Sequence, residues 1–125
     1  MGGSETILLV DDEKDILEST AEILQSLGYT VIPAISGEDA LRLVDSGAAA
    51  DLLLTDVVMT GMDGKQLADA LLLKYPHMKV LYMSGHLDDK LKAHEVPGPG
   101  VEMLEKPLMT DRLARTIRSL LDGDG

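Results

Sequence analysis

Five polar side chains directly follow short apolar segments of the chain, and together they could transfer a phosphoryl group with the help of a metal ion. They are Asp11, Asp12, Asp56, Ser84 and Lys106. A carboxylate can be the nucleophile in such a reaction and form an aspartyl phosphate. A lysine and a hydroxyl can then neutralise and hydrogen-bond the oxygens of the transferring group. Oxygen ligands in a chain without cysteine favour Mg²⁺ over zinc.

Taken one at a time, these side chains have simpler explanations. Asp11 and Asp12 precede an expected helix, where carboxylates cap amide groups. A serine before a glycine is typical of a turn, and a single lysine is usually a solvated surface charge. These separate explanations do not account for why all five side chains come at the ends of apolar runs, which would bring them together at one edge if the runs form a sheet. Carboxylates about 5 Å apart repel by roughly 3 kcal/mol at an effective dielectric constant near 20, which Lys106 or a bound divalent metal could relieve.

Apolar runs and helical spacings alternate along the chain. The runs predict five strands: Thr6–Val10, Tyr29–Ala34, Leu52–Thr55, Lys79–Met83 and Val101–Glu105. Amphipathic spacing predicts helices over Asp15–Leu27, from the Ser36 cap to Gly47, over Lys65–Tyr75 and over Asp111–Leu121. Between the last two strands only a short or irregular fourth helix is expected, over Asp88–His94, because a Pro- and Gly-rich segment follows it.

This alternation predicts an α/β fold, a doubly wound five-stranded parallel sheet of the flavodoxin-like type with helices on both faces. Right-handed crossovers favour the strand order 2-1-3-4-5. In such sheets ligands bind at the carboxyl ends of the strands, at the point where the strand order reverses. For this order that point lies between the first and third strands, where Asp11, Asp12 and Asp56 are expected.

Composition limits the class of protein. The 125 residues suit one domain spanning 1–125, with loosely held ends at 1–5 and 122–125. Acids outnumber bases by 22 to 11, and the net charge of −11 disfavours direct nucleic-acid binding, because nucleic-acid phosphates would repel the chain. No apolar run approaches the length needed to span a bilayer, and Met1–Ser4 lack the basic and apolar regions typical of a signal peptide, so secretion is not expected. The lack of cysteine fits a cytoplasmic location.

Five segments, in order and at the expected spacing, resemble the receiver domains of two-component response regulators. They are 7–13 (Ile-Leu-Leu-Val-Asp-Asp-Glu), 53–59 (Leu-Leu-Thr-Asp-Val-Val-Met), 61–64 (Gly-Met-Asp-Gly), 83–85 (Met-Ser-Gly) and 105–107 (Glu-Lys-Pro). The resemblance covers essentially the whole chain. It implies a (βα)5 receiver fold and a phosphoacceptor that switches a protein–protein interaction within a phosphorelay.

The resemblance also implies a role for each acid. Asp56 would be the phosphoacceptor. Asp11 and Asp12, together with Asp56 and the backbone carbonyl of Val58, would hold Mg²⁺, with Mn²⁺ as a possible substitute. The domain would catalyse its own phosphorylation and dephosphorylation, so it would not count as an enzyme in isolation.

Further roles implied by the resemblance fall on the later strands. Ser84 would be the switch hydroxyl, and Lys106 would pair with the phosphoryl group. Lys106–Pro107 is a candidate cis peptide. His86, two residues past the switch hydroxyl, either gates water access to the phosphoryl group or is a surface histidine. Met103 stands where the family often has the Tyr or Phe of the switch.

The family implies particular partners as well. The phosphoryl donor would be a phosphohistidine on a histidine kinase or a histidine phosphotransfer protein. Residues 80–85 and the Pro- and Gly-rich segment before the last strand resemble the carboxyl-terminal receivers of hybrid sensor histidine kinases. The chain would then be a cytoplasmic domain, or the cytoplasmic part of a membrane-bound hybrid kinase. It is expected to be a monomer or a weak dimer.

Two more features depart from the usual sequence of the family. Thr60 stands where the family often has proline, so the loop is expected to be somewhat looser. The irregular segment 87–100 makes dimerisation through a fourth helix less favourable.

Three other classes of protein compete with this interpretation. A flavodoxin-like electron carrier would need a phosphate-binding loop where this chain has acids. A haloacid-dehalogenase-type phosphatase would need a second acid two residues after its nucleophile and a cap insertion. A pseudo-receiver would share the fold without being phosphorylated.

Overall fold

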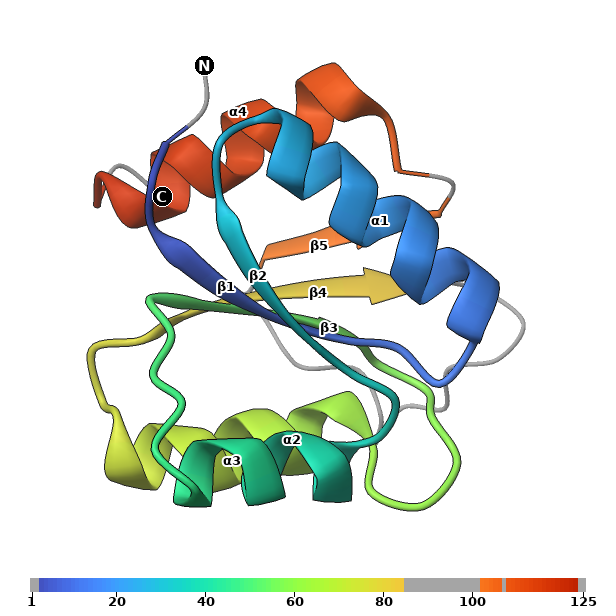
Figure 1. The fold of residues 1–125 in the computed structure, drawn as a ribbon, viewed down its shortest axis with the longest axis vertical. Helices are drawn as coiled ribbons and strands as arrows, with labels where there is room; N and C mark the ends of the chain where they lie inside the picture. The colour runs from blue at the N-terminus through green and yellow to red at the C-terminus, as the bar shows by residue number, and fades with distance from the viewer. Residues whose placement is uncertain (1–2, 85–101, 107, 124–125) are drawn as a thin grey trace.

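The computed structural model describes residues 3–84, 102–106 and 108–123, and in them five parallel strands form one sheet with helices on both faces (Figure 1). The strand order is β2-β1-β3-β4-β5, as the sequence predicts. The strands are β1 (Thr6–Val10), β2 (Thr30–Ala34), β3 (Leu52–Asp56), β4 (Lys79–Ser84) and β5 (Glu102–Glu105). The helices described are α1 (Lys14–Ser26), α2 (Gly37–Asp45), α3 (Gly64–Lys74) and α4 (Thr110–Leu121).

The strands that carry the acids are the most deeply buried. β1 and β3 pair with each other in the middle of the sheet, and every residue of β3 is buried. Strands covered by helices on both faces favour continuous aliphatic runs, which explains the Leu- and Val-rich sequence of both segments. β3 and β4 each extend one residue further than predicted, so Asp56 and Ser84 are the last residues of their strands.

Helix ends are specified by local sequence. Ser36 Oγ accepts a hydrogen bond from the Asp39 amide and caps α2, as predicted. Gly28, at φ +99°, follows α1, and its amide and the next one donate back to the last turn of the helix. The start of α3 carries a full capping box, in which the side chains of Asp63 and Gln66 each accept from the other's backbone amide.

The sheet separates two apolar layers, one beneath α1 and α4 and the other beneath α2 and α3 (Figure 1). The fully buried large side chains of the first layer are Ile7, Leu9, Leu24, Leu52, Leu54, Leu81, Met83 and Leu113. Those of the second layer are Leu8, Leu53, Leu67 and Leu71. Alternate residues of each central strand therefore enter opposite layers, as the twofold period of a strand requires.

At the amino edge of the sheet, a cluster of charged groups joins the two ends of the described chain. Arg118 of α4 donates to both carboxylate oxygens of Glu5, at 3.1 and 2.6 Å, and also to Asp122. The hydrogen bonds from Arg118 lower the pKa of Glu5 to about 2. Gly3 donates to the carbonyl of Leu27. Within the segment 1–5, which the sequence predicts to be loosely held, Gly3 and Glu5 thus make these contacts, and how firmly the segment is held stays a prediction.

Several predicted features fall on residues that the structure does not describe. They are the irregular fourth helix Asp88–His94, His86, the Pro- and Gly-rich segment before β5, and Pro107 with its candidate cis peptide. The first residue predicted for β5, Val101, also belongs to this set. Among the residues described, no helix has the length and apolar character needed to cross a membrane.

Candidate functional site

The register of the sheet brings the predicted site residues to its carboxyl edge. Val10 pairs with Thr55, so Asp11 and Asp56 follow at the same level on neighbouring strands. Ser84 pairs with Glu105, and the Lys106 amide donates to the Ser84 carbonyl at 2.8 Å. Residues separated by up to 95 positions in the sequence therefore meet at one edge.

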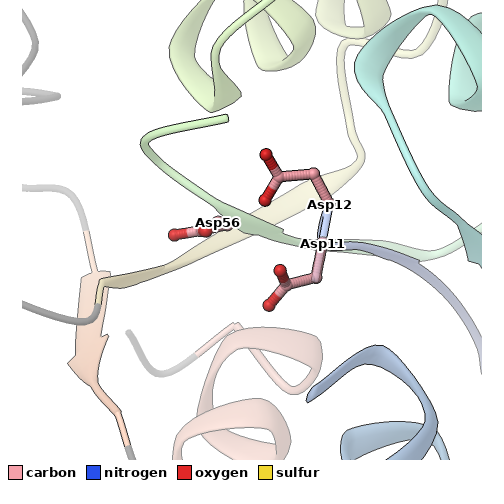
Figure 2. A group of neighbouring side chains, drawn as sticks. All are labelled: Asp11, Asp12 and Asp56. Atoms are coloured by element: carbon pink, nitrogen blue, oxygen red, sulfur yellow. The ribbon is translucent and has the colours of Figure 1, made fainter. Parts of the chain in front are cut away.

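Asp11, Asp12 and Asp56 form a compact group of acids (Figure 2). One carboxylate oxygen from each lies within 4.8 Å of the others. Asp11 is fully buried and Asp56 is 6% exposed, whereas Asp12 is exposed. Figure 2 shows the Asp11 and Asp12 side chains leaving the end of β1 in opposite directions, with Asp56 beside them. The group is therefore open to solvent on the side of Asp12.

Lys106 supplies the positive charge that the buried acids need. Its Nζ lies 2.8 Å from Asp11 Oδ2 and 3.3 Å from Asp56 Oδ2, and its side chain is only 11% exposed. Burial by itself lowers the pKa of Lys106, but the hydrogen bond to Asp11 and the charges of Asp56 and Asp11 outweigh it, so the pKa is raised. The lysine is therefore charged at neutral pH and bridges both carboxylates.

Even with Lys106 beside it, Asp56 is an unusual carboxylate. Burial raises the pKa of Asp56 to about 6; the charge of Lys106 opposes this, and the charges of Asp11 and Asp12 add to it. One lysine does not neutralise three acids. The negative charge left over is what a divalent cation would compensate.

The raised pKa of Asp56 predicts a pH-dependent stability difference for Asp56→Asn without metal. The folded state favours the protonated carboxyl, so its contribution to stability is complete below the unfolded pKa near 3.9 and is lost as pH rises through about 6. The variant has no such loss. In EDTA, the free energy of unfolding of Asp56→Asn relative to the wild type is expected to increase by up to about 2–3 kcal/mol between pH 4 and pH 7. Above pH 7 the difference should stay constant.

Urea denaturation at several pH values measures this difference. Asp69→Asn is a suitable control, because the Asp69 side chain is 64% exposed. The Asp69 variant is expected to follow the wild-type profile. A stability difference for Asp56→Asn that is the same at pH 4.5 and pH 7 would contradict the assignment of the raised pKa to Asp56.

Backbone amides hold the two acids of β1 in separate ways. The Glu13 amide donates to Asp11 Oδ1 at 2.9 Å. The Thr60 amide, in the loop between β3 and α3, donates to Asp12 Oδ2 at 2.9 Å. The second contact could not be predicted from the side chains, because the donor is a backbone group. The only clue was that residue 60 is not proline, which has no N–H to donate.

The other predicted site residues lie around the acids at different depths. Ser84 is 2% exposed at the end of β4. Val58 lies two residues after Asp56 and is exposed, and the role of its carbonyl stays a prediction. Met103 is partly buried in β5, directly opposite Tyr82, and packs against the apolar layer beneath α2 and α3. Tyr82 is a buried neighbour of the switch position that the sequence did not point to, and burial raises its pKa to about 12.

Gly64 is a further site residue whose role the sequence did not reveal. It begins α3, is buried, and donates its amide to the Val57 carbonyl at 2.8 Å. A Cβ atom at this position would lie 2.2 Å from the carbonyl oxygen of Asp56. Only glycine leaves room for α3 to begin so close to the backbone of Asp56.

The donor set fits a hard divalent cation. All three side chains contribute carboxylate oxygens, and no sulfur or imidazole is among them. Mg²⁺ prefers oxygen ligands and is usually bound through one or two carboxylates while it keeps several waters, which the exposed side of the group allows. Asp11, Asp12 and Asp56 would hold such an ion.

Comparison with known proteins places this arrangement in a family. Residues 7–118 match the response regulator receiver domain. The chain belongs to this family, the receiver domains of two-component systems. This assignment agrees with the resemblance read from the five sequence segments. The strand order of the sheet is also the one expected for the flavodoxin-like receiver fold.

Among the relatives is sensor kinase CckA of Brucella abortus (strain 2308), which is 35% identical over 123 residues. The match covers 98% of this chain but only 13% of that protein, so the chain spans about an eighth of its length. A response regulator receiver protein from Sinorhizobium medicae WSM419 is 32% identical, with a TM-score of 0.83 and 98% of each chain covered. The receiver domain of hybrid histidine kinase CckA is 32% identical, with a TM-score of 0.76, covering 93% of this chain and 98% of that one.

Proposed function

We propose that the chain accepts a phosphoryl group on Asp56 from a phosphohistidine, with a bound Mg²⁺ or Mn²⁺ ion, and thereby switches a protein–protein interaction. The observation that carries this proposal is the setting of Asp56. Its carboxylate is the last side chain of a buried strand, 3.3 Å from the Lys106 ammonium and grouped with two further acids. A structural role would not require a third acid beside the two that Lys106 already contacts.

In the proposed reaction, an oxygen of the Asp56 carboxylate attacks phosphorus and the bond from phosphorus to the donor imidazole nitrogen breaks. That nitrogen takes the electron pair, and the imidazole leaves. Lys106, already at hydrogen-bond distance from Asp11, would pair with an oxygen of the transferred group. The Ser84 hydroxyl would donate to another. A bound divalent ion would neutralise the charge that builds up on the equatorial oxygens.

The proposal is tested by intact-mass measurement after incubation with acetyl phosphate. With Mg²⁺ the wild type is expected to gain one phosphoryl group, and this gain should disappear in EDTA and in Asp56→Asn. Asp69→Asn, which removes an exposed carboxylate of α3, is the matched control and should still be modified.

Two outcomes would count against this function. An adduct that persists in Asp56→Asn would move the phosphoacceptor elsewhere. No adduct under any metal condition, together with no binding of beryllofluoride, would make the chain a pseudo-receiver. Beryllofluoride binding without an adduct would instead indicate a phosphoryl group too short-lived to trap.

The parent protein and its partners follow from the relatives only as a proposal. The relatives include a sensor kinase and the receiver of a hybrid histidine kinase. We infer that the donor is a histidine kinase or a histidine phosphotransfer protein, and that the chain is the cytoplasmic receiver of a hybrid kinase. The domain would not act as an enzyme in isolation and would be a monomer or a weak dimer.

The readout of phosphorylation would pass through Ser84 and Met103. Ser84 lies at the end of β4, and Met103 sits opposite Tyr82 on the neighbouring strand. A hydroxyl drawn toward the phosphoryl group would move the end of β4, and the flexible Met103 side chain could follow without a fixed ring orientation. His86 and the Lys106–Pro107 peptide keep the roles that the family resemblance implies for them, as predictions.

A further inference from the structure

One hydrogen bond joins the exposed acid of the site to the loop that follows the phosphoacceptor strand. The Thr60 amide donates to Asp12 Oδ2 at 2.9 Å, across 48 positions of sequence. It is the only hydrogen bond to the Asp12 carboxylate among the described residues. Asp11, by contrast, is buried and bound by both Lys106 and the Glu13 amide.

Asp12 needs such a donor more than Asp11 does. Its side chain is exposed and lies beside two other carboxylates, and Lys106 contacts those two rather than Asp12. An exposed acid in that position would gain by turning into solvent, away from like charges. The Thr60 amide binds one oxygen of the Asp12 carboxylate and leaves the second oxygen available.

The loop that carries the Thr60 amide is itself fixed at several points. The Met62 amide donates to Glu38 Oε2 of α2 at 3.3 Å. The Gly64 amide donates to the Val57 carbonyl at 2.8 Å. Gly61, at φ +81°, provides the backbone conformation that joins these contacts. The loop that carries the donor is therefore also held by contacts other than the one to Asp12.

We propose that Thr60 is a positioning residue, whose backbone N–H orients the Asp12 carboxylate for binding the divalent metal. The inference rests on the proposed function, in which Asp12 is a ligand. It gives this chain an orienting contact at position 60 that family members with proline there lack, because proline has no N–H to donate. The Thr60 side chain has no part in it.

Thr60→Pro and Thr60→Ala form a matched pair, because both remove the hydroxyl and only the first removes the N–H. Mg²⁺ affinity is measured for the full chain by isothermal titration, without any phosphoryl donor. Thr60→Pro is expected to bind Mg²⁺ about three- to tenfold more weakly than the wild type, the range for losing one hydrogen bond to a charged group on a partly free side chain. Thr60→Ala is expected to stay within about twofold of the wild type.

Each outcome decides the proposal. Equal affinity of Thr60→Pro and the wild type would overturn it, and so would a Thr60→Ala variant as weak as Thr60→Pro. Wild-type protein that binds no Mg²⁺ would overturn the metal-binding part of the proposed function as well. Weaker binding confined to Thr60→Pro supports the positioning role.

A second measurement serves if Thr60→Pro does not fold, as judged by its urea transition. In the metal-free wild type, the Thr60 amide proton should resonate downfield in the proton–nitrogen NMR spectrum, because it donates to a carboxylate. In Asp12→Ala it should move upfield, while the Glu13 amide proton, bonded to Asp11, should move less. An unmoved Thr60 resonance would overturn the proposal.

Discussion

Replacing Lys106 by methionine is expected to slow phosphorylation of Asp56 by about two to three orders of magnitude, the effect of removing one preorganised charge stabiliser. It is also expected to destabilise the metal-free protein by about 3 kcal/mol at neutral pH, because a buried charge pair loses one partner. Methionine keeps an unbranched, flexible side chain, one heavy atom shorter than lysine, and lacks the charge. Asp11, fully buried and 2.8 Å from Nζ, would be left without its cation.

The loss of stability should depend on pH and on metal. Below about pH 6, the pKa of Asp56, that carboxylate is protonated, so less negative charge remains for Lys106 to compensate. The deficit of Lys106→Met should therefore be smaller at pH 5 than at pH 8. The raised pKa of Lys106 keeps its own contribution intact up to the unfolded value near 10.5, beyond which it is lost as pH rises. Mg²⁺ should restore part of the stability, since it supplies positive charge to the same acids.

Urea denaturation in EDTA and in Mg²⁺, with phosphorylation rates from intact mass, tests both parts. Lys14→Met is the control, because its side chain is 80% exposed and lies 4.0 Å from its only described partner, Glu18. The control should change stability by less than about 0.5 kcal/mol. Equal phosphorylation rates in Lys106→Met and the wild type would show that Lys106 does not assist the transfer.

Gly64→Ala is expected to destabilise the protein by about 3 kcal/mol, at the upper end of the range for overpacking a buried site. The new Cβ would lie 2.2 Å from the Asp56 carbonyl oxygen and 3.1 Å from Val57 Cα. Both atoms belong to the backbone, so no side chain can turn away to make room. Either α3 or the end of β3 must move, and the second movement would displace the phosphoacceptor.

Gly37→Ala offers a closely matched control for that substitution. Gly37 is the first residue of α2, as Gly64 is of α3, and both follow a side chain that caps the helix. A Cβ at Gly37 would meet the side chain of Met62, which is flexible. In urea denaturation, Gly37→Ala should change the free energy of unfolding by less than about 1 kcal/mol. Similar midpoints for the two variants would mean that the approach of α3 to Asp56 is not tight.

Much of the site could be predicted because hydrophobic runs locate strands and strand ends locate ligands. Asp11, Asp56, Ser84 and Lys106 each follow or end such a run, and the structure brings them to one edge. Strand order followed from general rules of chain connection. Helix boundaries agreed to within one residue where a cap or glycine marks them, as at Gly28.

The contacts that could not be predicted depend on backbone groups and on distance in space. Asp11 and Asp12 are the same residue type at adjacent positions, yet their surroundings differ. Asp11 is buried against Lys106, whereas Asp12 is exposed and accepts a hydrogen bond from the Thr60 amide. The side chain of Thr60 does not predict its hydrogen bond to Asp12, because the donor is the backbone amide. Gly64 was recognisable as part of a motif, but the atom that requires it, the Asp56 carbonyl oxygen, approaches only after the loop folds back.

The ion pair between Arg118 and Glu5 has a consequence for how such a domain can be tethered. It fastens the last described helix to the entry of β1, at the amino edge of the sheet, so both ends of the described chain leave from the side opposite the acids (Figure 1). Flanking polypeptide attached at either end would start far from Asp56 and would not obstruct a docking donor. The same geometry lets the domain be inserted into different chain architectures without redesigning its site.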